Sequence, residues 1–284
     1  MRYSIWFARL IQGLIITLVV ACLGSANAVD IALQVTAGGE TRKFSRDALL
    51  ARPDAQNIEI PADIAYGKAM RFRAVPLAEL LKGLRLPADG VIETVAQDGF
   101  VAHVPIHLIT NTDQKKAIAW LAIEPSDAPW PSLPGKSESA GPFYIVWTGA
   151  AAKTVSSEQW AYQVVRLESQ LSPASRWPEI TVDPALPATD QARAGQALFI
   201  TQCLPCHTIN GAGSGNVGPD MNNPMNPTQY MTRKALHALI RDPKSVRNWP
   251  TQIMPGFAND QMSDQNIEAV IAYLAHMALR KTRN

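Results

Sequence analysis

Three side chains close together in the sequence could do chemistry. Cys203 and Cys206 are separated by two residues, and His207 follows directly. Such a thiol pair could form a redox-active dithiol, supply half of a zinc site, or add across the two vinyl groups of haem. In the last case the adjacent histidine is carried beneath the iron. The motif therefore indicates thiol, zinc or haem chemistry at this position.

The sequence around the motif favours haem. A thioredoxin-like dithiol opens a helix in a βαβ context, whereas this motif is expected to close a helix and enter a loop rich in Gly and Asn. A zinc site needs a second ligand pair, and the only other cysteine is Cys22, far away near the start of the chain. We therefore predict one covalent haem c, with Cys203 and Cys206 as thioether anchors and His207 as an axial ligand.

A sixth ligand should come from later in the chain. Met254 is our prediction, because Pro255 and Gly256 break regular structure and allow an extended loop to aim a thioether at iron. Four other candidates fall at helical positions and are interpreted as ordinary core or surface residues, namely Met231, Met277, His237 and His276. The remaining candidates are Met221, Met225 and Met262. The carbonyl of Pro219 is predicted to accept the free ring N–H of His207.

The elements that must position these residues are expected to be helices. The first should span residues 190–202 with Thr189 as its N-cap, and the second residues 228–241, stopped by Pro243. A last helix should begin after Ser263. Its apolar residues recur at helical spacing, at Ile267, Val270, Ile271 and Leu274.

Residues 189–280 resemble a small monohaem cytochrome c domain with His and Met ligation. The residues that carry this resemblance are Gly195 and Phe199, the segment from Cys203 to His207, Gly218-Pro219, Met254-Pro255 and Tyr273. The resemblance implies an all-α fold whose first and last helices cross closely, with Gly195, Phe199 and Tyr273 as packing residues. It also implies transfer of single electrons, because a filled sixth position leaves no room for oxygen or peroxide.

Residues 29–170 are expected to form an α+β domain rich in β-structure. The strands 91–97 and 100–105 should be joined by a two-residue turn at Asp98-Gly99, in which both residues accept positive φ. A short helix should begin at Pro76 and cover 77–81. Further strands are expected at residues 31–36, 117–123, 143–148 and 162–167.

This first domain resembles a shortened molybdopterin-binding fold of the sulfite oxidase family. The phrases that carry the resemblance are Arg71 to Leu77, Gln97 to Phe100, Trp120 to Ala122, Gly141 to Phe143 and Glu158 to Trp160. Catalytic members of that family bind molybdenum through a cysteine thiolate, and this chain has no cysteine between Val29 and Gln202. Molybdopterin is therefore not expected, and the domain is predicted to be free of cofactor.

Other chemical side chains of the first domain have ordinary interpretations. His103 and His107 could bind a metal, but a histidine with satisfied hydrogen bonds on or beside a strand is the simpler reading. The tryptophans are assigned to the core: Trp120, Trp130, Trp147 and Trp160. Three acids lie in a loop rich in Pro, Ser and Gly and are assigned to solvent: Glu124, Asp127 and Glu138.

The chain is expected to divide into four parts. Residues 1–28 have a basic start, a short apolar run and Ala-Asn-Ala at the end, as a cleaved signal peptide does. The run is too short for a membrane span, although processing before Cys22 would instead give a lipid-anchored protein. Then follow the β-rich domain (29–170), a Pro-rich linker (171–188) expected to contain neither helix nor central strand and to be stiff and extended, and the cytochrome domain (189–284).

Charge and motif together lead to a functional prediction. Without the signal peptide, which carries two arginines, the chain has equal numbers of basic and acidic residues, and this excludes a typical nucleic-acid-binding protein. We expect a periplasmic electron carrier, not an enzyme. Its first domain would act as an adaptor for a periplasmic or membrane-bound dehydrogenase, reductase or oxidase. Membrane contact is expected only if Cys22 carries lipid. The alternative is an enzyme whose first domain oxidises a small substrate and passes electrons to the haem.

Overall fold

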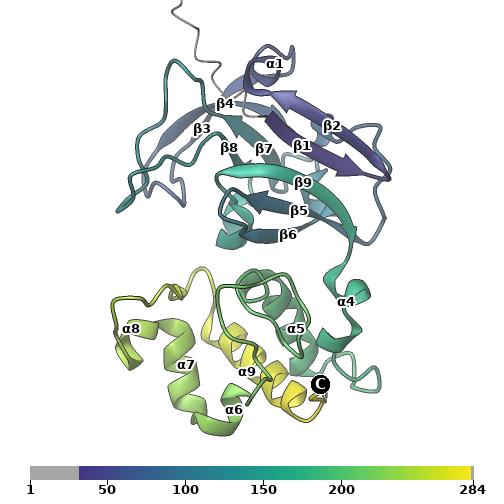
Figure 1. Ribbon diagram of the computed structural model, residues 1–284, viewed down its shortest axis with the longest axis vertical. Helices are drawn as coiled ribbons and strands as arrows, with labels where there is room; N and C mark the ends of the chain where they lie inside the picture. Colours follow the sequence, from purple (N-terminus) through teal and green to yellow (C-terminus); the bar gives the residue numbers. More distant parts are fainter. Residues whose placement is uncertain (1–31, 283–284) are drawn as a thin grey trace, which may run out of the picture. The chain divides into compact units, whose positions relative to one another are not determined.

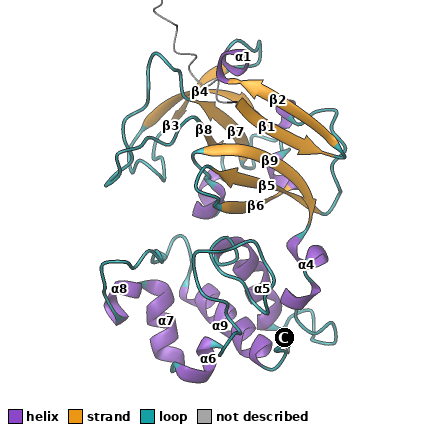
Figure 2. Cartoon of the chain, in the orientation of Figure 1, coloured by secondary structure: helices purple, strands orange, loops and turns teal. Residues whose placement is uncertain are grey.

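A computed structural model describes residues 32–282 of the chain. The predicted signal peptide and Cys22 lie outside the described residues. Residues 32–282 lie within one compact unit. Strands occupy the first part of this unit and the long helices its last part (Figure 2). We call residues 32–171 the sheet region and residues 172–282 the helical region.

The sheet region contains two sheets within the described residues (Figure 1). The first has the strand order β2-β1-β9-β5-β6, in which only the pairing of β1 with β9 is parallel. Its strands are β1 Ala32–Ala37, β2 Glu40–Ser45, β5 Gly90–Ala96, β6 Val101–Pro105 and β9 Val164–Leu171. The second is antiparallel, with the strands β3 Gln56–Ile60, β4 Met70–Pro76, β7 Ile118–Ile123 and β8 Phe143–Thr148 in that order.

The burial of these strands follows their residue patterns. β1 alternates between half-buried and buried residues, so one of its faces packs on the core. All of β7 and nearly all of β8 is buried, as their continuous apolar runs require. The core of this region includes Trp120, Trp147 and Trp160, which confirms the core assignment for these three, and Trp130 packs against it partly buried. The short helical segments are α1 Arg46–Leu50, α2 Leu77–Leu80, α3 Ile106–Ile109, η1 Ala152–Thr154 and η2 Ser157–Gln159.

The predicted hairpin is present, but its turn differs from the prediction. β5 and β6 pair antiparallel with Val95 opposite Val101, so four residues separate the strands instead of two. Only Gly99 has a positive φ, and its N–H donates to the carbonyl of Ala96. Asp98 instead accepts the backbone N–H of Phe100. The turn is therefore of the kind in which a single glycine takes the left-handed conformation, and Asp98 acts through its side chain.

Three strands of the sheet region are absent from the prediction, namely β2, β3 and β4. β2 reads Glu-Thr-Arg-Lys-Phe-Ser, and its residues are exposed or half-buried. β3 is mostly exposed as well. β2 and β3 lie at sheet edges and contain few apolar residues, so their sequences show little hydrophobic periodicity. Their structure is determined instead by pairing with β1 and β4.

The helical region is built from two long helices and several short ones (Figure 1). The first and last long helices confirm the prediction, except that Asp190 replaces Thr189 as the N-cap of the first. The predicted second helix is wrong as one element, because the chain leaves helical geometry at Met231 and Thr232 caps a new start. The elements are α4 Pro173–Arg176, η3 Pro178–Ile180, α5 Gln191–Gln202, α6 Pro227–Tyr230, α7 Arg233–Arg241, α8 Pro243–Val246 and α9 Asp264–Ala278.

Close packing of α5 on α9 forms the centre of this region. A Cβ atom at Gly195 would lie 1.9 Å from the carbonyl oxygen of Ala269, so only glycine allows the two helices to approach this closely. The rings of Phe199 and Tyr273 pack beside this crossing, with centroids 5.1 Å apart. The packing roles implied for these three residues are confirmed.

Residues 172–188, which lead from β9 to α5 and which we call the connecting segment, are not the extended linker that their prolines suggest. Pro173 and Pro178 each begin a short helical turn, because a missing N–H costs nothing at the first position of a helix. Ile180 and Val182 are buried in the core of the helical region. The expectation that this segment contains no helix is therefore wrong, and much of it packs as part of the helical region.

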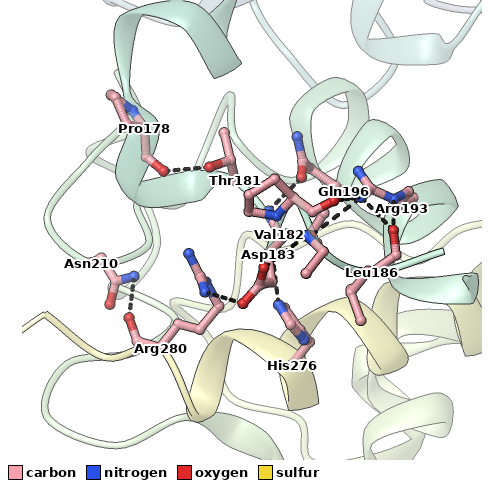
Figure 3. Close-up of polar contacts among 12 residues, drawn as sticks. Pro178, Thr181, Val182, Asp183, Leu186, Arg193, Gln196, Asn210, His276 and Arg280 are labelled. Atoms are coloured by element: carbon pink, nitrogen blue, oxygen red, sulfur yellow. Dashed lines mark hydrogen bonds and ion pairs between the residues drawn. The ribbon is translucent and has the colours of Figure 1, made fainter. Parts of the chain in front are cut away.

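Polar contacts hold the same segment on α5 and α9 (Figure 3). The N–H of Asp183 donates to Nε2 of His276 over 3.0 Å, and its carboxylate lies 3.2 Å from Arg280. The guanidinium of Arg193 donates to several backbone carbonyls of this segment, including those of Pro184 and Leu186. Since Nε2 of His276 accepts this bond, the ring is engaged as an ordinary structural histidine.

No helix among residues 32–282 combines the length and the apolar character needed to cross a bilayer.

Candidate haem site

The end of α5 positions the two cysteines. Cys203 is the C-cap residue of this helix, and the backbone N–H groups of Cys206 and His207 both donate to its carbonyl, over 3.1 and 2.9 Å. Three predicted site residues are thus folded into one turn. Both thiols are free and partly buried. The turn therefore presents two unpaired sulfur atoms and an imidazole from a single short segment.

The electrostatics of this turn differ from those of a redox dithiol. Burial raises the pKa of Cys203 to about 12 and that of Cys206 to about 11, and the negative charge of Glu158 adds to both shifts. Reactive dithiols have lowered pKa values and commonly lie at helix N-termini. Here the pair follows a helix C-terminus, where the dipole disfavours a thiolate. The turn is therefore poorly suited to thiol–disulfide chemistry.

The ring of His207 is held in one orientation. Its Nδ1 lies 2.9 Å from the carbonyl oxygen of Pro219, so Nδ1–H donates and the lone pair of Nε2 stays available for a metal. Burial lowers the pKa of His207, and the bond to Pro219 offsets part of this shift. Gly218 makes room for the ring, because a Cβ atom there would lie 2.2 Å from Cε1. The imidazole is therefore neutral, oriented and closely surrounded.

The loop after His207 is organised by Asp220. Its carboxylate accepts the hydroxyl of Thr208 over 2.9 Å and the N–H groups of Gly211 and Asn222 over 2.7 and 2.8 Å. Nearby, the N–H of Gly218 donates to the carbonyl of Cys206 over 2.8 Å. These bonds join both ends of the loop, so the carbonyl of Pro219 is held where it can accept the hydrogen bond from Nδ1 of His207.

Three buried asparagines connect this loop to α9. Asn222 donates to Oδ1 of Asn210 and to the carbonyl of Met277, each over 2.8 Å. Asn226 donates to Oδ1 of Asn222 over 2.6 Å and to the carbonyl of Leu274 over 3.0 Å. These side chains therefore fasten the loop to backbone carbonyls near the end of α9. Sequence reasoning missed this set, although the stretch 222–226, which contains two of its members and also Asn223, is visibly rich in asparagine.

Met254 lies half-buried in the irregular segment between α8 and α9. The chain is fastened just after it, where Phe257 is buried and exchanges backbone and side-chain hydrogen bonds with Arg241 over 3.2 and 2.5 Å. Gly256 allows this, since a Cβ atom would lie 2.7 Å from the carbonyl of Arg241. Met277, by contrast, is fully buried in the core, which confirms that interpretation. His237 lies 3.4 Å from the carboxylate of Asp264.

The two histidines of the sheet region have different environments. His103 is buried on β6 with Nε2 3.2 Å from the carboxylate of Glu93, whereas His107 is exposed on α3. Within the part of the chain that the structure describes, no group of three or more His, Cys, Asp or Glu side chains could hold a metal ion. Glu124 is not fully solvated as expected, because it accepts hydrogen bonds from Trp130 and Ser139 and so orders the loop.

The donor set of the turn fits a covalently attached haem. Two unpaired cysteines flank two residues, and the next residue is a neutral histidine whose Nδ1 is occupied and whose Nε2 lone pair is available. A helical region that carries such a site is typical of proteins that bind haem through two thioether bonds.

Comparison with known families agrees with this class. Residues 192–278 match the family model described as cytochrome c. The match covers less than a third of the chain and supports a c-type cytochrome domain there, with a covalently bound haem c and a role in electron transfer. It is also consistent with an extracytoplasmic protein. No curated protein matches the chain.

Proposed function

We propose that this protein is a periplasmic electron carrier with one covalent haem c. Cys203 and Cys206 are the thioether anchors, His207 and Met254 the axial ligands, and Pro219 orients His207. One observation carries the proposal: the turn at the end of α5 presents two free sulfurs and an imidazole whose Nδ1 is held by the Pro219 carbonyl. The periplasmic location rests on the predicted signal peptide in residues 1–28.

The roles of the residues follow from their chemistry. A bound haem supplies an iron that can accept and return one electron. The neutral His207 would donate through Nε2, with its basicity raised by the bond that Nδ1–H makes to Pro219. A thioether from Met254 would favour reduced iron and fill the position that oxygen or peroxide would need. The chain's residues thus favour electron transfer over oxygen chemistry.

In this proposal the sheet region is an adaptor that does no chemistry and docks a periplasmic or membrane-bound redox protein. Its support is compositional, since no cysteine occurs between Val29 and Gln202 that could bind molybdenum. A neutral overall charge gives no reason to expect nucleic acid as a partner. The likeness of residues 29–170 to the sulfite oxidase family remains a prediction.

Expression of the full chain with a haem-attachment pathway tests the proposal. We expect haem that survives denaturation and organic extraction, with iron near one per chain and no molybdenum. Cys203→Ala/Cys206→Ala should remove all covalent haem. Single substitutions should leave at most one thioether, which mass spectrometry of peptides detects. A colourless protein, or stoichiometric molybdenum with pterin, would overturn the proposal.

A further inference from the structure

The sheet region contacts the helical region at the proposed haem-attachment turn. η2 and β6 pack against α5. The hydroxyl of Ser156 donates to Oε1 of Gln202 over 2.9 Å, and Gln202 directly precedes Cys203. Beyond His207, Oγ of Ser214 lies 3.4 Å from Nε2 of His103. The two contacts thus fall on both sides of the Cys203–His207 turn in the sequence.

A buried charged cluster fixes this contact. Glu93 on β5 pairs with His103 and with Arg176, which lies on α4 in the connecting segment. The side chains of Glu93 and His103 are only 9% and 1% exposed, so these interactions are shielded from water and salt. Arg176 also stacks on Trp177, 4.2 Å from the ring centroid. The strands next to η2 are therefore held firmly to the start of the helical region.

η2 brings one carboxyl group to the two thiols. Glu158 is the middle residue of this short helix, two residues after Ser156, which bonds to Gln202. Its side chain is half-buried. Because η2 packs against α5 and Gln202 directly precedes Cys203, this short helix brings Glu158 to the attachment turn. In keeping with this placement, the charge of Glu158 raises the pKa of both Cys203 and Cys206. Burial raises its own pKa to about 7. η2 thus brings a carboxyl group from the sheet region to the attachment turn.

We propose that Glu158 sets the reduction potential of the haem, holding a negative charge at the thioether side and so stabilising the oxidised iron. This inference rests on the proposed function, because it requires that haem is bound there. Ferric haem carries one more positive charge than ferrous haem, and a nearby carboxylate favours the more positive state. The electron that reduces the iron comes from the redox partner, and no bond to Glu158 forms or breaks. The sheet region would then contribute to the redox centre in addition to docking a partner.

Potentiometric titration of the haem-loaded full chain at pH 8.5, where a carboxyl with a pKa near 7 is ionised, tests this inference. Glu158→Gln should raise the midpoint potential. The expected gain is about three- to tenfold in the equilibrium constant for reduction, and tenfold corresponds to about 59 mV for one electron. Glu158→Asp keeps the charge and should stay near the unsubstituted protein. Glu138→Gln, which removes an exposed carboxylate from the sheet region, is the matched control and should change the potential little.

The possible results separate the two proposals. If the unsubstituted chain takes up no covalent haem, the proposed function fails. If haem is bound and Glu158→Gln leaves the potential unchanged or lowers it, the role of Glu158 is overturned while the electron carrier remains. An equal rise in Glu138→Gln would also overturn it, because the effect would then not depend on proximity. The Asp variant shows whether the change reflects lost charge or disturbed packing of η2.

Discussion

At the scale of single residues, the candidate site depends on which atoms are already engaged. His207 uses Nδ1 for the carbonyl of Pro219, so only Nε2 remains for a metal. His237 and His276 are engaged with Asp264 and with the N–H of Asp183. The histidine next to the cysteines is therefore the one whose surroundings suit a ligand, and Met254 is the proposed partner on the other side of the iron.

Substitution of Met254 tests its proposed role. In the haem-loaded chain, Met254→Ala should abolish the far-red absorption band of methionine-ligated ferric haem and lower the reduction potential, because a sulfur ligand favours reduced iron. Met225→Ala serves as the control, since Met225 is 50% exposed. If Met254→Ala keeps the band while another methionine variant loses it, the ligand assignment is wrong.

The residues of the site differ in how far sequence alone could reveal them. Cys203, Cys206 and His207 are neighbours in the chain, so their spacing carries the chemical information. Ser214 and His103 are 111 residues apart, and Ser156 and Gln202 are 46 apart. Contacts at such separations arise only from the tertiary fold, and no local pattern indicates them.

At the scale of elements, the crossing of α5 and α9 determines whether the helical region can form. Gly195 lies against the backbone of Ala269 and the Cβ of Tyr273, at distances that leave no space for a methyl group. The interhelical contact places the end of α5, and with it Cys203, relative to the last helix. A glycine that would weaken an isolated helix is thus required by packing.

Gly195→Ala should destabilise the protein although alanine is the better helix former by about 1 kcal/mol. The added methyl group must push the two helices apart, and overpacking of this kind costs about 1–3 kcal/mol. Urea unfolding of the haem-loaded chain measures the change. Ala194→Ser adds one heavy atom at an exposed position of the same helix and should cost less. Equal or higher stability of Gly195→Ala would contradict the close approach.

The start of α9 agrees with the prediction because a clear capping residue marks it. Ser263 caps α9 as predicted, through a bond from the N–H of Asn266. The prediction of a single helix over residues 228–241 missed the break between α6 and α7. Thr232 is nevertheless a good cap residue, and its hydroxyl accepts the N–H of Ala235. A capping residue inside the predicted helix was therefore the local signal for this break.

At the scale of the whole molecule, the connecting segment stabilises the helical region. Tyr273 donates its hydroxyl to the carbonyl of Ile180 over 2.7 Å, and Ile180 and Val182 are buried beside α5 and α9. A proline-rich composition predicted a spacer, because composition does not show which apolar residues find a partner surface. The prediction therefore failed at Ile180 and Val182, whose burial depends on helices that follow much later in the chain.

Comparison of two haem-loaded fragments tests this role. A fragment of residues 172–284 should unfold at a higher temperature than one of residues 189–284. The shorter fragment loses the burial of Ile180 and Val182, each contributing about 1.5–3 kcal/mol, and the hydrogen bond of Tyr273. Thermal unfolding followed by haem absorbance measures the difference. Equal midpoints would mean that the segment contributes nothing to the stability of the helical region.

The contacts of Asp183 and Ile180 with α9 also bear on how the helical region folds. Each contact joins residues that are 93 positions apart in the sequence. Because a contact of this range forms only after the chain between its ends has closed into a loop, the connecting segment and α5 are expected to gain their packing partner late in folding. Docking of α9 is therefore the step that completes this region.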